Sequence, residues 1–291
     1  MALAFYPVKI HLPLGMNLLN RFGQFLVYSN VWIAICSGFW TLGSFRMIHG
    51  ESAKTLDPFS QWVFVGVNVL GVFLFYGFSR LIHFPKPEKA ESELNRWYIQ
   101  HRKWILISST LVTLGLLSYN IEMLWSWRFW LTSLPAILYL VKVKNWSIRS
   151  IWFIKPLWVA GAWWWFTVGM LQEPDWMGTD GIWISASLFL FLLELSMLSD
   201  WVDAREDRLH QTDTWINHLS LNQVQFGVAI LQGVVTFCCD SWIPVVLLTV
   251  SNIAYWLIPK FLKPGWKNQF IQESILVTPL LMQTIIDLWQ E

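Results

Sequence analysis

Three aspartates within residues 198–215, LSDWVDAREDRLHQTDTW, have a spacing suited to metal-ion chemistry. Asp200, Asp203 and Asp207 stand at i, i+3 and i+7, so on a helix they share one face, about one turn apart. Carboxylate oxygens grouped in this way suit Mg²⁺, which proteins hold through one or two carboxylates together with water and substrate phosphates. Because two arginines are interleaved with the acids, the alternative is a solvated acidic loop at the end of the preceding apolar helix. The spacing alone leaves both interpretations open.

The composition places this motif in a membrane protein. The 291 residues have a mean hydropathy of +0.45, and 13% are charged, against a usual share of about 25%. Apolar residues occur in long blocks rather than in alternation, which is typical of a polytopic all-α membrane protein. We predict a single membrane-embedded domain over residues 1–291, with residues 1–23 as an interfacial segment. A net charge of +1 without a basic stripe argues against a nucleic-acid partner.

The apolar blocks predict a bundle of nine transmembrane helices, because lipid cannot hydrogen-bond to an unpaired backbone. The nine segments are 24–45, 60–79, 104–120, 123–141, 151–170, 181–199, 222–239, 241–259 and 268–289. Segments five to eight begin about 120 residues after segments one to four. This offset predicts two copies of a four-helix unit, followed by a ninth helix.

The basic residues predict the orientation of this bundle. With nine helices, all but three of the 20 Lys and Arg residues fall on the side shared by the N-terminus and the loops after helices two, four, six and eight. The exceptions are Arg46, Lys54 and Arg128. By the positive-inside rule the N-terminus is then cytoplasmic and the C-terminus lies on the opposite side. The aspartate motif faces the cytoplasm, where Mg²⁺ and phosphorylated metabolites are found.

The motif resembles the second aspartate-rich motif of the UbiA-type intramembrane prenyltransferase superfamily, whose pattern is D-x-x-D-x-x-x-D with a threonine seven residues on. Asp200, Asp203, Asp207 and Thr214 match these places. The segment Tyr139–Lys155, YLVKVKNWSIRSIWFIK, is similar to the tyrosine-and-lysine segment that family members carry between helices four and five. Nine helices with the motif after the sixth also match the fold of that superfamily.

This resemblance implies an enzyme of a bacterial-type inner membrane that transfers a prenyl group from an isoprenoid diphosphate to a hydrophobic acceptor, either aromatic or lipid. Asp200, Asp203 and Asp207 would be its catalytic residues, acting through the Mg²⁺ that they hold. Metal and basic groups would neutralise the charge that builds on the departing diphosphate. The basic residues expected to bind the diphosphate are Arg80, His83, Lys142, Lys144 and Arg149.

The first aspartate-rich motif of the family is missing. Family members carry it at the end of helix two, where this chain has FLFYGFSRLIHFPKPEK, with no acid before Glu88. The repeat offset places Arg80 and His83 opposite Asp200 and Asp203, so fixed positive charge could replace one metal ion. The alternative is a catalytically degenerate protein of the same fold that acts as a lipid-binding or scaffold protein. The sequence leaves both functions open.

Other charged residues within the predicted spans have structural as well as functional interpretations. Glu194 lies six residues before Asp200 and about 120° around the helix. Acids at such depth usually face a partner or a cavity, so Glu194 is also the main candidate for a third hypothesis, a small-solute transporter. Lys155 could point into the bundle or outward. We expect Glu273 to be exposed at the membrane interface.

Overall fold

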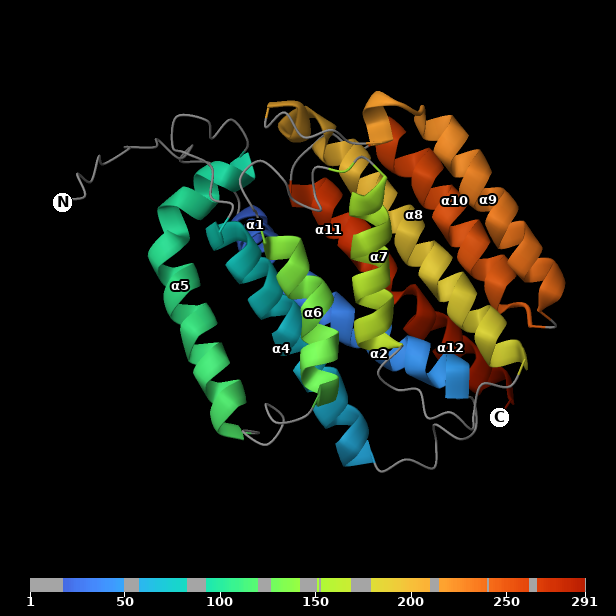
Figure 1. Ribbon diagram of the computed structural model, residues 1–291, viewed down its shortest axis with the longest axis horizontal. Coiled ribbons are helices and arrows are strands. Elements are labelled where there is room, and N and C mark those ends of the chain that lie inside the picture. The colour runs from blue at the N-terminus through green and yellow to red at the C-terminus, as the bar shows by residue number, and fades with distance from the viewer. Residues whose placement is uncertain are drawn as a thin grey trace.

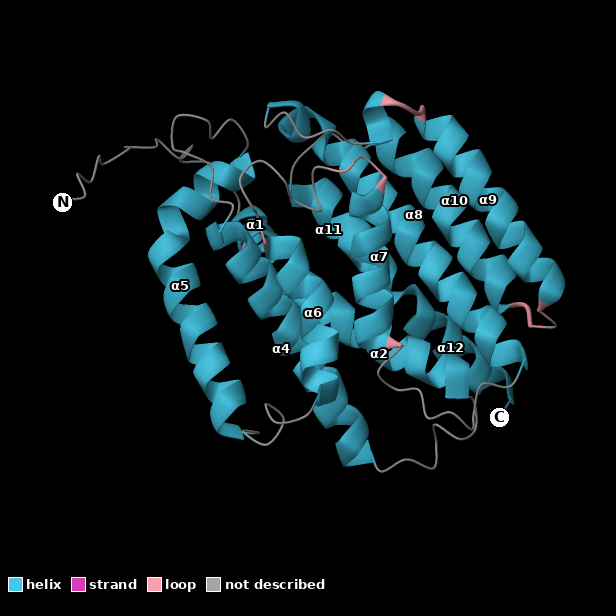
Figure 2. Cartoon of the chain, in the orientation of Figure 1, coloured by secondary structure: helices cyan, strands magenta, loops and turns pink. Residues whose placement is uncertain are grey.

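The structure is a computed structural model, and its regular structure is helical throughout the part of the chain that it describes (Figure 2). The described residues are 18–49, 58–82, 93–119, 127–141, 151, 153–168, 179–209, 215–239, 241–261 and 266–290. None of these residues forms a strand. The predicted all-α class is therefore confirmed for these ranges.

The helices follow the predicted apolar segments, with two exceptions. The first half contains α1 (Leu18–Tyr28), α2 (Val31–His49), α4 (Pro58–Ile82), α5 (Glu93–Tyr119) and α6 (Trp127–Leu140). The second half contains α7 (Ile154–Thr167), α8 (Thr179–Leu209), the 3₁₀ turn η6 (Trp215–Asn217), α9 (Leu221–Cys238), α10 (Ile243–Phe261), α11 (Trp266–Ser274), the 3₁₀ turn η7 (Ile275–Val277) and α12 (Thr278–Gln290). Asn30, with a φ of 62°, separates α1 from α2, and η7 separates α11 from α12. The first and last predicted helices are thus each divided, and the count of nine is not confirmed in the described residues.

Four of the described helices are long and apolar enough to cross a bilayer. Their candidate spans are Val31–His49, Gln61–Ser79, Gly181–Trp201 and Leu221–Cys238. Large apolar side chains also cover the outside of the bundle, for example Trp104 and Phe237, which are 72% and 92% exposed. An apolar surface of this extent is suited to lipid rather than to water.

Successive helices run in opposite directions, as Figure 1 shows for α4 to α10. The ends of α4, α6, α8 and α10 and the starts of α5, α7 and α9 therefore lie on the same side of the bundle, at the top of that view. Arg80 on α4, Lys155 on α7 and the aspartate motif on α8 all belong to these helix ends. Because α5 begins at Glu93, well before the predicted start at 104, Arg96 and Lys103 lie on a helix and not in a loop.

Helices α2 and α8 form the centre of the bundle. Both bury most of their apolar spans, whereas α4 and α9 bury about a quarter of theirs. Trp40 of α2 stacks on Phe191 of α8 with 5.8 Å between ring centroids, and both rings are fully buried. The indole Nε1 of Trp40 donates a hydrogen bond of 3.0 Å to Oγ1 of Thr167, at the end of α7. Side chains therefore fill the space between α2 and α8 at this level.

Helix α2 approaches α12 so closely that position 43 requires glycine. A Cβ atom added to Gly43 would lie 2.3 Å from the backbone nitrogen of Leu280 and 2.6 Å from the carbonyl carbon of Pro279. Backbone atoms within a helix cannot move aside as the end of a flexible side chain can. Small residues that allow two backbones to approach in this way are typical of helix packing within membranes.

Candidate functional site

The aspartate motif lies on the last turns of α8, which continues without a break from Thr179 to Leu209. The prediction that Asp200, Asp203 and Asp207 stand on one helical face is confirmed for the backbone. Of these three side chains, that of Asp200 is among the described ones. The side chains of Asp203, Asp207 and Arg80 lie outside the described set, and so do His83, Lys142, Lys144 and Arg149 in full.

Asp200 forms a buried ion pair with Lys155, which the first turn of α7 brings to it. Nζ of Lys155 lies 2.7 Å from Oδ1 of Asp200, and the two side chains are 8% and 6% exposed. Pro156 follows in the same first turn, where a helix does not need the N–H group that proline lacks. Of the two orientations open for Lys155, the structure thus has the inward one. For Asp200, the interpretation as a solvated loop does not hold.

This ion pair is energetically different from one on the surface. Each charge would lose several kcal/mol of hydration if it were buried alone, and the attraction between the two offsets that loss. Removing one partner of a buried pair costs ~3–5 kcal/mol, against ~0–1 kcal/mol for an exposed pair. The Lys155–Asp200 pair therefore fixes α7 against α8 and directs the first acid of the motif into the bundle.

Glu194 is a second buried acid of α8, and its hydrogen bonds link this helix to α9 and α10. Nε2 of Gln232 on α9 donates a hydrogen bond of 3.2 Å to its Oε2. The hydroxyl group of Tyr255 on α10 donates one of 2.9 Å to its main-chain oxygen. All three residues are at most 3% exposed. Of the two interpretations of Glu194, a partner in the bundle or a cavity, the structure has a partner, Gln232.

Trp215 and Tyr255 surround the motif from elements that sequence reasoning did not connect with it. Trp215 opens η6, which packs on α8, and its fully buried Nε1 has no acceptor among the described residues. Tyr255 on α10 donates to the main-chain oxygen of Glu194 and lies near the carboxyl groups of Glu194 and Asp200. No local pattern marks these residues, because each comes from a different helix or turn. The one available signal was the position of Trp215 directly after Thr214.

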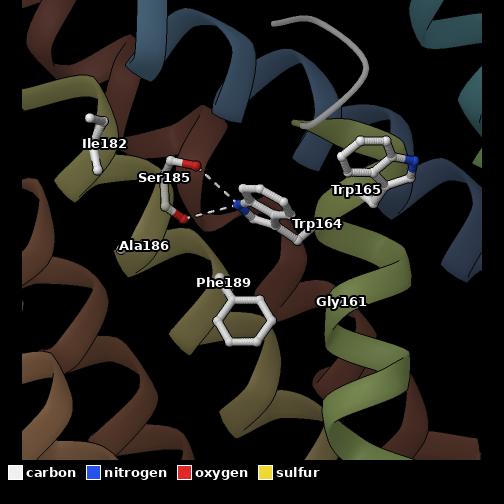
Figure 3. A pocket seen from close by; sticks show the side chains of 7 residues that line it. All are labelled: Gly161, Trp164, Trp165, Ile182, Ser185, Ala186 and Phe189. Atoms are coloured by element: carbon white, nitrogen blue, oxygen red, sulfur yellow. Dashed lines mark hydrogen bonds between the residues drawn. The ribbon is translucent and has the colours of Figure 1, made fainter. Parts of the chain in front are cut away.

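An apolar groove of about 620 Å³ opens between α7 and α8, in the half of these helices away from the ion pair. Nε1 of Trp164 donates to both the main-chain oxygen and Oγ of Ser185 at 3.1 Å (Figure 3). The polar groups of that wall are therefore engaged with each other, and Trp165 points away from Ser185. The lining consists of Gly161, Trp164, Trp165, Ile182, Ser185, Ala186 and Phe189. This surface suits a hydrocarbon chain and offers little to a polar ligand.

The expectation for Glu273 was wrong. Its side chain is 7% exposed and Oε1 accepts a hydrogen bond of 2.8 Å from Nε2 of Gln269. The reason is that α11 packs inward against α1 and α2, where Trp32 stacks on Phe270 with 4.4 Å between centroids. Glu273 thus belongs to the interior of the bundle and not to the membrane interface.

Among the described side chains, no three His, Cys, Asp or Glu groups converge as metal ligands. The carboxylates of Asp203 and Asp207 are outside that set, so the predicted Mg²⁺ site stays a prediction. Comparison of the chain with protein-family models, curated proteins and solved structures found no match. The resemblance to UbiA-type prenyltransferases therefore rests on the motif, on the helix pattern and on the segment before α7.

Proposed function

We propose that the protein is a membrane-embedded, UbiA-type prenyltransferase that binds an isoprenoid diphosphate between the start of α7 and the last turns of α8 and transfers its prenyl group to a hydrophobic acceptor. The observation that carries the proposal is the buried pair of Lys155 and Asp200. Because this pair is buried, it favours a polar site inside the bundle at the start of the motif over a solvated loop. It also supplies a lysine, a common partner of phosphate groups.

The donor set of the motif fits Mg²⁺. Positions 203 and 207 continue the face of α8 on which Asp200 stands, about one and two turns further along. Because Asp200 is engaged with Lys155, Asp203 and Asp207 are the residues that would hold the ion through carboxylate oxygens. When bound, Mg²⁺ would neutralise charge on the departing diphosphate. The ammonium group of Lys155 has three N–H donors, so it could donate to a phosphate oxygen while it stays paired with Asp200.

The apolar groove lies on the same two helices as the proposed head-group site. Trp164 stands nine residues after Lys155 on α7, which corresponds to about 13 Å along the helix. A diphosphate bound between the start of α7 and the last turns of α8 could thus extend its prenyl chain along these helices toward the groove. The arrangement supports a ligand with a charged head and a hydrocarbon tail.

The helix contacts also support two four-helix units of UbiA type. α4 contacts α2, α5 and α6, and α8 contacts α7, α9 and α10. The members of these two groups correspond in chain order, and each helix of the second group begins about 120 residues after its counterpart. In this arrangement Arg80, near the end of α4, corresponds in position to Asp200 on α8.

Two observations favour a second candidate, a lipid-binding or scaffold protein without transferase activity. Lys155 already occupies an oxygen of Asp200, and Trp40 with Phe191 fills the space between α2 and α8. A protein that kept the bundle but lost the first aspartate-rich motif and its activity would not require an open metal site, and these contacts could then close it. Binding and turnover must therefore be measured separately.

The test uses the full chain in lipid nanodiscs, with farnesyl diphosphate as the probe. We expect the probe to bind only with Mg²⁺, and Asp203→Ala to abolish this binding. Asp287→Asn is the control, because it removes a carboxylate from α12, outside the motif. We expect this control to bind the probe like the wild type.

Release of diphosphate in the presence of lipid and aromatic acceptors then separates the two candidates. Mg²⁺-dependent binding with release supports the transferase. Binding without release for any acceptor supports the lipid-binding protein. Binding that needs no Mg²⁺ and survives Asp203→Ala contradicts the role proposed for the motif.

A further inference from the structure

Glu194 carries a carboxyl group in the middle of the bundle, and no described side chain places a positive charge beside it. Its side chain is 1% exposed and makes no ion pair with any described residue. Lys155, the lysine that reaches the same helix, is bound to Asp200. In the part of the chain that the structure describes, the carboxyl group of Glu194 contacts neutral groups, the amide of Gln232 and the hydroxyl of Ser251.

An ionised carboxylate in such a place is strongly unfavourable. Burial without a cation removes its hydration, and neutral donors replace only part of it. A carboxylate can avoid this penalty by taking up a proton, since the carboxylic acid is neutral. Glu194 lies within the candidate span Gly181–Trp201, where water is not available to solvate a charge.

Gln232 provides an independent indication of where the proton lies. Its Nε2 donates to Oε2 of Glu194, whereas its Oε1 is fully buried and has no donor among the described residues. A buried carbonyl oxygen without a donor is rare, because it loses its hydrogen bonds to water without replacement. The hydroxyl of a protonated Glu194 is a donor on the same carboxyl group that Gln232 already contacts. An acid and an amide can satisfy each other in this way through two hydrogen bonds.

We propose that Glu194 is a proton-binding site that holds a carboxylic acid at neutral pH, paired with Gln232 at the junction of α8, α9 and α10. Asp200, six residues further along α8, is ionised through Lys155. One helix thus carries two buried carboxyl groups in opposite protonation states. This assignment stands on the surroundings of Glu194 and does not depend on the proposed transferase activity.

The titratable groups around Glu194 are consistent with this assignment. Helix α10 contributes Tyr255, which donates to the main-chain oxygen and leaves the carboxyl group to other partners. Helix α9 contributes the neutral Gln232, and α7 contributes Lys155, engaged with Asp200.

Helix α2 also packs on α8. It carries Cys36, Arg46 and His49, none of which forms an ion pair with Glu194. No described neighbour therefore supplies the cation that would keep Glu194 ionised.

Infrared spectroscopy of the full chain in nanodiscs tests the proposal, because a protonated carboxyl group has a C=O stretch separate from those of carboxylates and amides. At neutral pH we expect such a band in the wild type and its loss in Glu194→Gln, which keeps the shape of the side chain. Asp287→Asn is the matched control. It alters an acid of α12 that accepts a hydrogen bond from Gln283, and it should leave the band unchanged.

A second variant keeps the test informative if Glu194→Gln does not fold. Gln232→Met removes the amide partner, so the band should shift to higher frequency as the hydrogen bond to the acid is lost. Absence of the band in the wild type contradicts the proposal, and so does a band that neither substitution at these two positions alters. Loss of the band in Glu194→Gln or its shift in Gln232→Met supports it.

Discussion

Replacing Lys155 by methionine should destabilise the protein far more than the loss of a surface charge. Methionine keeps most of the length of the side chain and removes the ammonium group that lies 2.7 Å from Oδ1 of Asp200. The carboxylate of Asp200 then stays buried without its cation. We expect a loss of ~3–5 kcal/mol in the free energy of unfolding, the usual cost of breaking a buried ion pair on one side.

The double variant Lys155→Met/Asp200→Leu should recover most of this loss. It removes both charges together, and apolar replacement of a whole buried pair is often neutral or even stabilising by ~1–4 kcal/mol. The two single variants and the double variant form a thermodynamic cycle that isolates the coupling between the side chains. Arg96→Met on α5 is the control, since Arg96 is exposed, and its loss should stay within about 0.5 kcal/mol.

The assay is reversible unfolding of the purified chain in mixed micelles with increasing denaturing detergent, followed by tryptophan fluorescence. The 22 tryptophans of the chain make this signal strong. If Lys155→Met and Arg96→Met lose equally little stability, the ion pair is not the buried contact described above. If the double variant is as unstable as the sum of the single variants, the two side chains are not coupled.

Three further substitutions and one control test the packing of the bundle, each by the same unfolding measurement. Gly43→Ala should cost ~1–3 kcal/mol because its Cβ meets the backbone of α12, whereas Gly66→Ala, with open space around its Cβ, should be neutral or stabilise by up to about 1 kcal/mol. Equal effects of the two would contradict the close approach of α2 and α12. Tyr255→Phe should cost about 1 kcal/mol through loss of the hydrogen bond to Glu194, and an unchanged stability would argue against that bond. Ser220→Ala should cost about 1 kcal/mol because it removes the capping box that begins α9, and this effect should be absent if the start of α9 is frayed.

The sequence was sufficient to predict the helices and the place of the motif. Apolar blocks of about 20 residues predict helices in lipid, and the structure has a helix at each block. The spacing of Asp200, Asp203 and Asp207 places them on one face if α8 continues through the motif. The helix does continue, to Leu209. Glu194 was expected to face a partner or a cavity because an acid at that depth is costly, and Gln232 is its partner.

Contacts between distant helices could not be predicted in the same way. Lys155 lies at the start of α7 and Asp200 lies toward the end of α8. No rule of sequence spacing relates two positions on different helices. The division of the first predicted helix at Asn30 depends on a backbone conformation that asparagine tolerates but does not demand. The position of Glu273 in the chain predicted exposure at the membrane interface. Its side chain is buried instead, because α11 packs inward against α1 and α2.

The central claim is that the motif on α8 holds a divalent ion against a diphosphate. Electron paramagnetic resonance with Mn²⁺ in place of Mg²⁺ tests it most directly, because both ions prefer oxygen ligands and coupling to ³¹P reports a bound diphosphate. We predict Mn²⁺ binding with ³¹P coupling in the presence of farnesyl thiolodiphosphate, loss of both in Asp203→Ala and retention of both in Asp287→Asn, which alters an acid of α12. A wild-type protein that binds no Mn²⁺ under these conditions, or an Asp203→Ala variant with an unchanged spectrum, would contradict the claim.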